Sequence, residues 1–252
     1  MDFVLRALLQ VVYTNLICIS VLTYDLTGMY YREKLSGLRL RECYDVAPDR
    51  IRQYLEAEIQ FVLSNVKDAS LVLELGCGYG RVLKPVASYA SFVIGSDISD
   101  DSLQLAKSYM KPFRNYMLVQ SDAAELSFRS NLFDAVLCIQ NGLSAFEADS
   151  NRVIRESIRV TKNNGTILFS SYSPKIWEER LKWFRKQSEA GLLGKIDDHR
   201  TLNGTIACYD GFTATTFSGT DFVKLFAEAG QHAQIIEIDN SSLFCRVTKE
   251  GK

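Results

Sequence analysis

The sequence predicts an α/β fold of the doubly wound, Rossmann-like kind. We expect a mostly parallel seven-stranded sheet with a C-terminal antiparallel hairpin and a small covering insertion. Short apolar runs alternate with amphipathic helical segments up to about residue 170, and the rhythm then changes. The chain has 252 residues, of which 47% are hydrophobic, which suits one large domain with an insertion rather than two full domains.

The alternating part begins with a helix expected over 49–66, where apolar residues recur at helical spacing and Asp49 follows Pro48 as a candidate N-cap. The next run, LVLEL over 71–75, is short, apolar and followed by glycines, which is typical of a buried parallel strand. The elements expected after it are helix 81–89, strand 92–97, helix 100–109, strands 116–120 and 133–140, helix 152–160 and strand 165–170.

The second part begins with an amphipathic helix over 175–188. Residues 204–217 alternate around Asp210-Gly211, which predicts a hairpin. Thr220 is expected to cap one further helix, which would run to residue 229, and strands over 234–238 and 242–248 would close the sheet. The predicted organisation is an N-terminal helical cap segment over 1–48 and a main domain over 49–252, with the insertion 173–218 as a lid.

Composition argues against several classes of function. The net charge is −1, and without a basic excess we expect no nucleic-acid partner. None of the six cysteines forms a C-x-x-C pair and there are only two histidines, so we expect no metal site. Such thiols are ordinary in a reducing compartment, and we therefore expect a cytoplasmic protein.

The N-terminal run 7–22 is mostly apolar but contains several polar residues, and it is shorter than the roughly 20 apolar residues of a membrane span. The pattern favours a buried or partner-packing helix over membrane contact through 7–22. A start upstream of the natural one, with Met29 as a more ordinary beginning, is the third interpretation.

A glycine-rich loop follows the first strand, with Gly76, Gly78 and Gly80 spaced so that a ligand can approach the backbone closely. A nicotinamide dinucleotide is one candidate ligand, but its fingerprint G-x-G-x-x-G would place the third glycine at the position of Arg81. Glu74, at the end of the strand, is unfavourable beside a pyrophosphate and suits a cationic ligand. The loop therefore favours a cationic ligand over a dinucleotide.

Two further carboxylates end the next strands. Asp97 ends the second strand, where an acidic side chain can accept hydrogen bonds from both ribose hydroxyls, and Ile98 can cover one face of an adenine. Asp122, followed by Ala123, ends the third strand, although an aspartate there is also a common turn former. Because open α/β sheets bind ligands at the carboxyl ends of their strands, these side chains predict one binding site.

The segments VLELGCGYGRV, IGSDIS, QSDAAEL and FDAVLCIQ resemble, in order and spacing, the cofactor motifs of class I S-adenosylmethionine-dependent methyltransferases, small-molecule type. The resemblance implies S-adenosylmethionine as cofactor. It implies that Glu74 acts on the methionyl ammonium and that the loop residues Gly76, Cys77, Gly78 and Gly80 pass beneath the methionyl group. Asp97 and Ile98 would hold the ribose and adenine, and Asp122 and Ala123 would contact the adenine amino group. Gln140 and Asn141 would lie beside the methyl group.

The resemblance leaves the methyl acceptor open. A small molecule methylated on oxygen or nitrogen is expected, since the Asn-Pro-Pro-Tyr type of tetrapeptide is absent after the fourth strand. His199 is a candidate general base by its residue type, and Asn141 is a second candidate by position. The alternatives are a membrane-associated methyltransferase acting on a lipid or quinone, and a non-catalytic cofactor-binding protein of the same fold. A monomer and a homodimer both fit.

Overall fold

In a computed structural model, residues 30–67, 69–146 and 149–251 are described. Their centre is a seven-stranded sheet in the order β3-β2-β1-β4-β5-β9-β8. The strands are β1 Leu71–Leu75, β2 Phe92–Asp97, β3 Tyr116–Gln120, β4 Phe133–Cys138, β5 Thr161–Tyr172, β8 Gln234–Ile238 and β9 Ser242–Thr248. Strands β1 to β5 pair in parallel, and β9 runs antiparallel between β5 and β8. The predicted fold class is confirmed.

Both faces of the sheet are covered, as the apolar strands require. Neighbouring residues of β1 point to opposite faces: Val72 packs in a core cluster with α3 (Asp49–Val66) and α4 (Leu83–Val86), whereas Leu73 packs in a cluster with α7 (Ser150–Val160) and α9 (Gly219–Glu228). Helix α5 (Asp100–Tyr109) contacts β2 and β3. A short helix, α6 (Gly142–Ala145), follows β4. The covered faces explain why the strands are apolar throughout.

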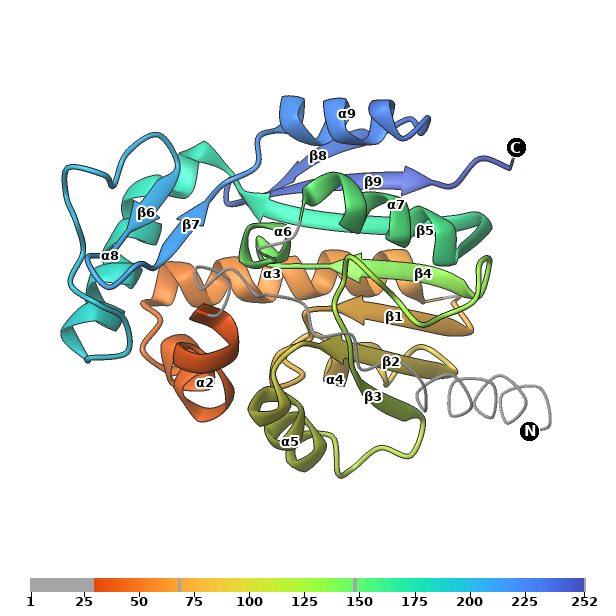
Figure 1. Ribbon diagram of the computed structural model, residues 1–252, viewed down its shortest axis with the longest axis horizontal. Helices are drawn as coiled ribbons and strands as arrows, with labels where there is room; N and C mark the ends of the chain where they lie inside the picture. The colour runs from red at the N-terminus through yellow and green to blue at the C-terminus, as the bar shows by residue number, and fades with distance from the viewer. Residues whose placement is uncertain (1–29, 68, 147–148, 252) are drawn as a thin grey trace, which may run out of the picture.

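A cap lies beyond the carboxyl ends of β1, β4 and β5. It combines the π-helical turn η1 (Tyr30–Lys34) and α2 (Gly37–Asp45) with η2 (Pro174–Ile176), α8 (Trp177–Glu189), β6 (Thr205–Ala207) and β7 (Thr213–Thr215). Figure 1 shows α2, α8, β6 and β7 gathered at this end of the sheet. One hydrophobic cluster joins the N-terminal and inserted parts, and the indole Nε1 of Trp183 donates to the carbonyl oxygen of Cys43 at 2.8 Å. Residues 30–47 and the insertion therefore pack against each other.

Several element boundaries differ from the prediction. The helix expected over 81–89 is only the single turn α4, which contains Pro85, and turns flank it. Strand β4 ends at Cys138, because Gln140 and Asn141 adopt left-handed φ values of 58° and 60°. Strand β5 begins at Thr161, four residues earlier than expected. The loop after β4 therefore begins after Cys138, whereas the apolar pattern predicts a strand that continues to residue 140.

Two predicted N-caps are wrong. Helix α3 is preceded by Pro48 as N-cap, and Asp49 is its first residue. Helix α9 is capped by Ser218 rather than Thr220. The Ser218 hydroxyl accepts from the backbone N–H of Asp221, and the Asp221 carboxylate accepts from the backbone N–H of Ser218, which is a reciprocal capping box.

The apolar run 7–22 lies outside the described residues. Within 30–67, 69–146 and 149–251, no helix combines the length and the apolar character that a bilayer crossing needs.

Candidate active site

A cavity of about 480 Å³ opens at the carboxyl ends of β1, β2 and β4. The predicted cofactor-binding residues that line it are Glu74, Gly76, Cys77, Gly78, Asp97, Ile98, Asp122, Ala123 and Gln140. Other lining residues come mainly from the cap, and we call the part of the cavity that they line the cap-side chamber: Tyr31, Arg32, Leu35, Cys43, Tyr44, Tyr172, Trp183, Phe184, Gln187, Phe212 and Ala214. The sheet edge and the cap thus face each other across one space.

The glycine loop owes its shape to left-handed backbone at Gly76 and Gly78, with φ values of 63° and 53°. A Cβ on Gly76 would come within 2.9 Å of the Phe146 ring, so both the conformation and the space require glycine there. Gly80 does not line the cavity. A Cβ on it would face Tyr109 and Met110 at 3.7 Å, so this glycine lies against the end of α5.

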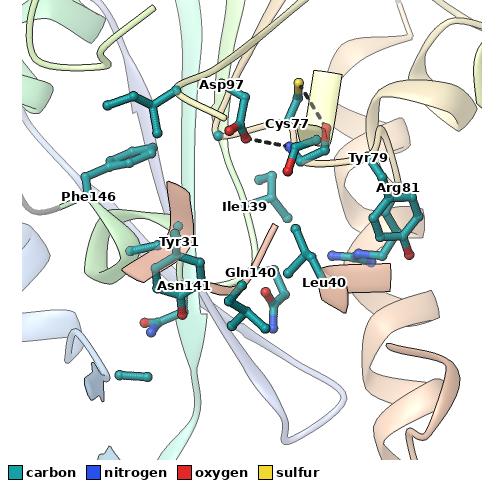
Figure 2. A pocket seen from close by; sticks show the side chains of 18 of the residues that line it. Tyr31, Leu40, Cys77, Tyr79, Arg81, Asp97, Ile139, Gln140, Asn141 and Phe146 are labelled. Carbon is teal, nitrogen blue, oxygen red and sulfur yellow. Dashed lines mark hydrogen bonds between the residues drawn. The ribbon is translucent and has the colours of Figure 1, made fainter. Parts of the chain in front are cut away.

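Asp97 ties the loop to the end of β2. Its carboxylate accepts from the backbone N–H of Gly78 at 2.8 Å and from that of Ser99 at 2.9 Å. Burial raises the pKa of the Asp97 carboxyl, and these hydrogen bonds oppose the rise. Figure 2 shows Asp97 and Cys77 close together in the upper part of the view, with Gln140 and Asn141 below them. The carboxylate is therefore held rigidly where the loop meets the cavity.

Glu74 is buried, with 4% of its surface exposed, and its Oε2 has no hydrogen-bond partner among the described residues. Burial raises the pKa of its carboxyl to about 8, although the nearby Arg81 favours the charged form. A buried acceptor without a partner costs free energy, which a ligand that donates hydrogen bonds would recover. The group suits an ammonium, as the sequence pattern predicts.

The side chain of Asp122, at the end of the third strand, both lines the cavity and stabilises a turn. Asp122 lines the cavity, but its Oδ1 also accepts from the backbone N–H of Ala124 at 2.8 Å, which is the turn-forming role weighed from the sequence. Ala123 is buried beside it. Ile98 is 40% exposed at the cavity, as expected of a residue that would cover a planar ring.

Gln140 is held between two phenols. Tyr44 donates from its hydroxyl to Gln140 Oε1 at 2.8 Å, and Gln140 Nε2 donates to the hydroxyl oxygen of Tyr172 at 2.6 Å. All three residues line the cavity. We call this chain Tyr44–Gln140–Tyr172 the phenol relay. It joins the cap to the ends of β4 and β5.

The two candidate catalytic residues have different surroundings. Asn141 lines the cavity, yet both ends of its amide are engaged: Nδ2 donates to the carbonyl oxygen of Thr215, and Oδ1 accepts from the hydroxyl of Ser171. His199 is exposed after α8 and is not among the cavity-lining residues. The structure thus places His199 outside the cavity lining, and it places the Asn141 amide between the cap and β5. No group of metal-ligating side chains occurs in the part of the chain that the structure describes.

A buried ion pair supports the loop from behind. Glu58 is fully buried and accepts from Arg81 at 3.0 Å and from the Ser170 hydroxyl at 2.7 Å. The Arg81 guanidinium also lies over the Tyr44 ring, 5.2 Å from its centre. Glu58 was not among the residues predicted from the sequence. Its signal was a carboxylate on the apolar stripe of the helix, four residues after the buried Tyr54.

Comparison with known proteins identifies the central segment, since a family model described as a methyltransferase domain matches residues 72–165. This match over 72–165 supports the class I S-adenosylmethionine-dependent methyltransferase superfamily. The resemblance stated from the motifs is thereby confirmed. The matched segment runs from β1 into β5 and contains the glycine loop, Asp97 and Gln140.

Curated relatives align with different shares of this chain. Protein MJ1252 of Methanocaldococcus jannaschii is 28% identical over 184 residues, which are 70% of this chain and 66% of the relative. The demethylmenaquinone methyltransferase of Staphylococcus saprophyticus is 35% identical over 107 residues, which are 41% of this chain and 45% of the relative. The chain thus spans less than two thirds of the length of these curated relatives.

Solved structures share the fold over nearly the whole chain. The PH0226 protein from Pyrococcus horikoshii aligns with a TM-score of 0.61 at 23% identity, covering 88% of this chain and 98% of that chain. The N-methyltransferase NodS from Bradyrhizobium japonicum, solved with S-adenosyl-L-homocysteine, aligns with a TM-score of 0.59 at 14% identity, covering 90% and 100%.

Proposed function

We propose that this protein transfers the methyl group of S-adenosylmethionine to an oxygen or nitrogen atom of a small-molecule acceptor. The observation that carries the proposal is the single cavity that joins the acidic, glycine-rich sheet edge to the cap-side chamber. The methyl donor would occupy the sheet edge and the acceptor the chamber. We expect a cytoplasmic enzyme, monomeric or homodimeric.

The residues at the sheet edge suit the parts of the donor. The unpartnered Oε2 of Glu74 would accept from the methionyl ammonium, and the left-handed loop at Gly76 and Gly78 would let the methionyl backbone approach closely. Asp97 would accept from the ribose hydroxyls and Ile98 would cover the adenine. Each of these roles is part of the proposal.

Methyl transfer is an in-line displacement at a carbon that the sulfonium already activates. The protein must mainly align the acceptor atom with the methyl group and keep water away. The aromatic side chains of the chamber, among them Trp183 and Phe212, supply an apolar, water-excluding wall. Gln140, fixed by the phenol relay at the end of β4, would lie beside the methyl group and orient the acceptor.

Calorimetry with S-adenosyl-L-homocysteine tests the donor site. Binding in the micromolar range is expected, as is typical of enzyme ligands. Asp97→Ala should weaken this affinity at least tenfold, because the variant loses the ribose acceptor and the clamp on Gly78. Asp100→Ala, which removes an exposed carboxylate three residues away, is the matched control. Wild-type protein that binds neither the product nor S-adenosylmethionine would refute the proposal.

A quinone or lipid acceptor is the second candidate. The relatives named for demethylmenaquinone and ubiquinone biosynthesis, together with the aromatic chamber, favour it. Comparing the membrane binding of the full chain with that of a chain starting at Met29 tests attachment through 7–22. The third interpretation, a non-catalytic cofactor-binding protein, predicts binding of the donor without labelled methyl transfer to any component of a metabolite extract.

A further inference from the structure

The phenol relay contains one hydroxyl hydrogen that takes no part in the hydrogen bonds within the relay. Tyr44 and Tyr172 each carry one hydroxyl hydrogen, and Gln140 between them offers one carbonyl oxygen toward one phenol and one amide N–H toward the other. One phenol therefore donates to the amide and the other accepts from it. If the amide were turned around, the two phenols would exchange roles and the sum would stay the same. One phenol O–H is left to donate to a molecule in the cavity.

Two more polar groups in the cap-side chamber are available to a ligand. Gln187 is only 3% exposed and lines the cavity. Tyr31 lines the cavity as well. The amide and the hydroxyl can both donate hydrogen bonds to a ligand with acceptor atoms.

A positive charge lies behind the relay. Arg180 is fully buried, with its Cζ 4.2 Å from the centre of the Tyr172 ring. Its guanidinium donates to the carbonyl oxygens of Gly204 and Ala214, and no carboxylate pairs with it among the described residues. Arg81, in contrast, is neutralised by Glu58. In a low-dielectric interior, an uncompensated charge favours an anion nearby and disfavours a cation.

Acidic side chains are confined to the other end of the cavity. Among the described residues, the acids that line it are Glu74, Asp97 and Asp122, all at the sheet edge where we place the methyl donor. The described lining of the cap-side chamber contains no aspartate, glutamate or histidine. An ammonium acceptor would find no counter-charge there and no base to take its proton.

We infer that the methyl acceptor is an apolar, ring-sized molecule with an acidic oxygen, a carboxyl or an acidic hydroxyl, which binds as an oxyanion against the phenol relay. This inference rests on the proposed function. The oxyanion would attack the methyl carbon, the carbon–sulfur bond would break, and its electron pair would remain on sulfur. The anion and the sulfonium would become a neutral ether or ester and a neutral thioether, so no proton would need to leave during transfer.

The test uses three naphthalene probes of similar shape: 2-naphthoate, 2-naphthol and 2-naphthylmethylamine. Calorimetry measures their affinity for the full chain saturated with S-adenosyl-L-homocysteine. At least one oxygen probe should bind about tenfold more tightly than the amine, and should accept labelled methyl from S-adenosylmethionine on oxygen. Tighter binding of the naphthoate points to a carboxyl, and tighter binding of the naphthol to a hydroxyl. Equal or tighter binding of the amine, no binding of any probe, or no transfer to the tighter oxygen probe overturns the inference.

The spare hydrogen belongs to the phenol that accepts from the Gln140 amide, which is Tyr172 in the orientation observed. At least one of Tyr44→Phe and Tyr172→Phe, the variant that loses this phenol, should weaken the tighter oxygen probe about tenfold while the affinity for S-adenosyl-L-homocysteine stays unchanged. Tyr89→Phe, at an exposed tyrosine after α4, is the matched control. If both relay variants keep the wild-type affinity for the probe, the relay is not the oxyanion site. Wild-type protein that does not bind S-adenosyl-L-homocysteine would instead contradict the proposed function. The two failures can therefore be told apart.

Discussion

The amide of Asn141 donates from Nδ2 to the carbonyl oxygen of Thr215, 3.1 Å away. The backbone N–H of Thr215 donates to the hydroxyl oxygen of Ser144 at 2.9 Å, so the segment after β4 binds both backbone polar groups of one residue in β7. Oδ1 of Asn141 accepts from Ser171 at 2.6 Å at the end of β5. Asn141, which directly follows the FDAVLCIQ motif, thus connects the cap to the sheet, and the shape of the cap-side chamber depends on this residue.

Asn141→Asp should loosen the cap with little change in side-chain size. A carboxylate oxygen would replace Nδ2 opposite the Thr215 carbonyl oxygen, and two acceptors repel each other. We expect faster hydrogen exchange over 205–215 and a raised KM for the acceptor, with unchanged exchange over 71–75. Asn163→Asp, at an exposed position of β5, is the control. Equal hydrogen-exchange rates over 205–215 in the wild type and Asn141→Asp would show that the hydrogen bond from Asn141 to Thr215 does not hold the cap.

Donor binding should release a proton from Glu74. Burial raises the pKa of its carboxyl to about 8, so the group is largely protonated at neutral pH in the free protein. A bound ammonium favours the carboxylate, and about one proton should leave per molecule of S-adenosyl-L-homocysteine bound. Calorimetry at neutral pH in buffers of different ionisation enthalpy measures this number. Glu74→Gln should abolish the release, whereas Glu228→Gln, at an exposed glutamate, should keep it.

The same group should make the free protein less stable as the pH rises. A folded-state pKa above the unfolded one means that the folded state binds the extra proton, so the stabilisation is full below about 4.5 and is lost as the pH rises through about 8. The melting temperature of the wild type should therefore fall relative to that of Glu74→Gln between about pH 6 and pH 9. If the melting temperatures of the wild type and Glu74→Gln change equally with pH across this range, Glu74 is already charged in the free protein.

Local pattern predicted the parallel part of the fold closely. The strands expected over 71–75, 92–97 and 116–120 match β1, β2 and β3 residue for residue, because each is a short apolar run that ends in a turn. The helix expected over 81–89 was wrong. Its apolar residues Leu83 and Val86 serve packing, and a proline lies between them, so periodicity alone overstated the length.

Contacts between distant segments escaped prediction. Trp183 meets the carbonyl of Cys43 across 140 residues of chain, and the phenol relay joins positions 44, 140 and 172. Nothing in the sequence places these partners together, because such contacts depend on how the cap folds onto the sheet. The donor side of the site was predictable because its residues follow successive strands of one sheet. The cap-side chamber was not.

The buried pair between Arg81 and Glu58 should show strong coupling in unfolding experiments. Arg81→Met leaves the fully buried Glu58 without its cation, which should cost about 3 to 5 kcal/mol of unfolding free energy. Combining it with Glu58→Gln should cost less than the sum of the two single variants, since each change removes the charge that the other leaves bare. Urea unfolding of the four proteins measures the coupling.

Arg52→Met provides the contrast for that cycle. Its partner Asp49 is 4.0 Å away and both side chains are largely exposed, so water already solvates the two charges and the pair should contribute less than about 1 kcal/mol. The two pairs differ in burial and in distance, which is 3.0 Å for Arg81 and 4.0 Å for Arg52, and both differences strengthen the Arg81 pair. If the Arg81 and Glu58 variants were additive, the guanidinium would be held by the Tyr44 ring rather than by Glu58, and the loop would depend on the cap instead of on α3.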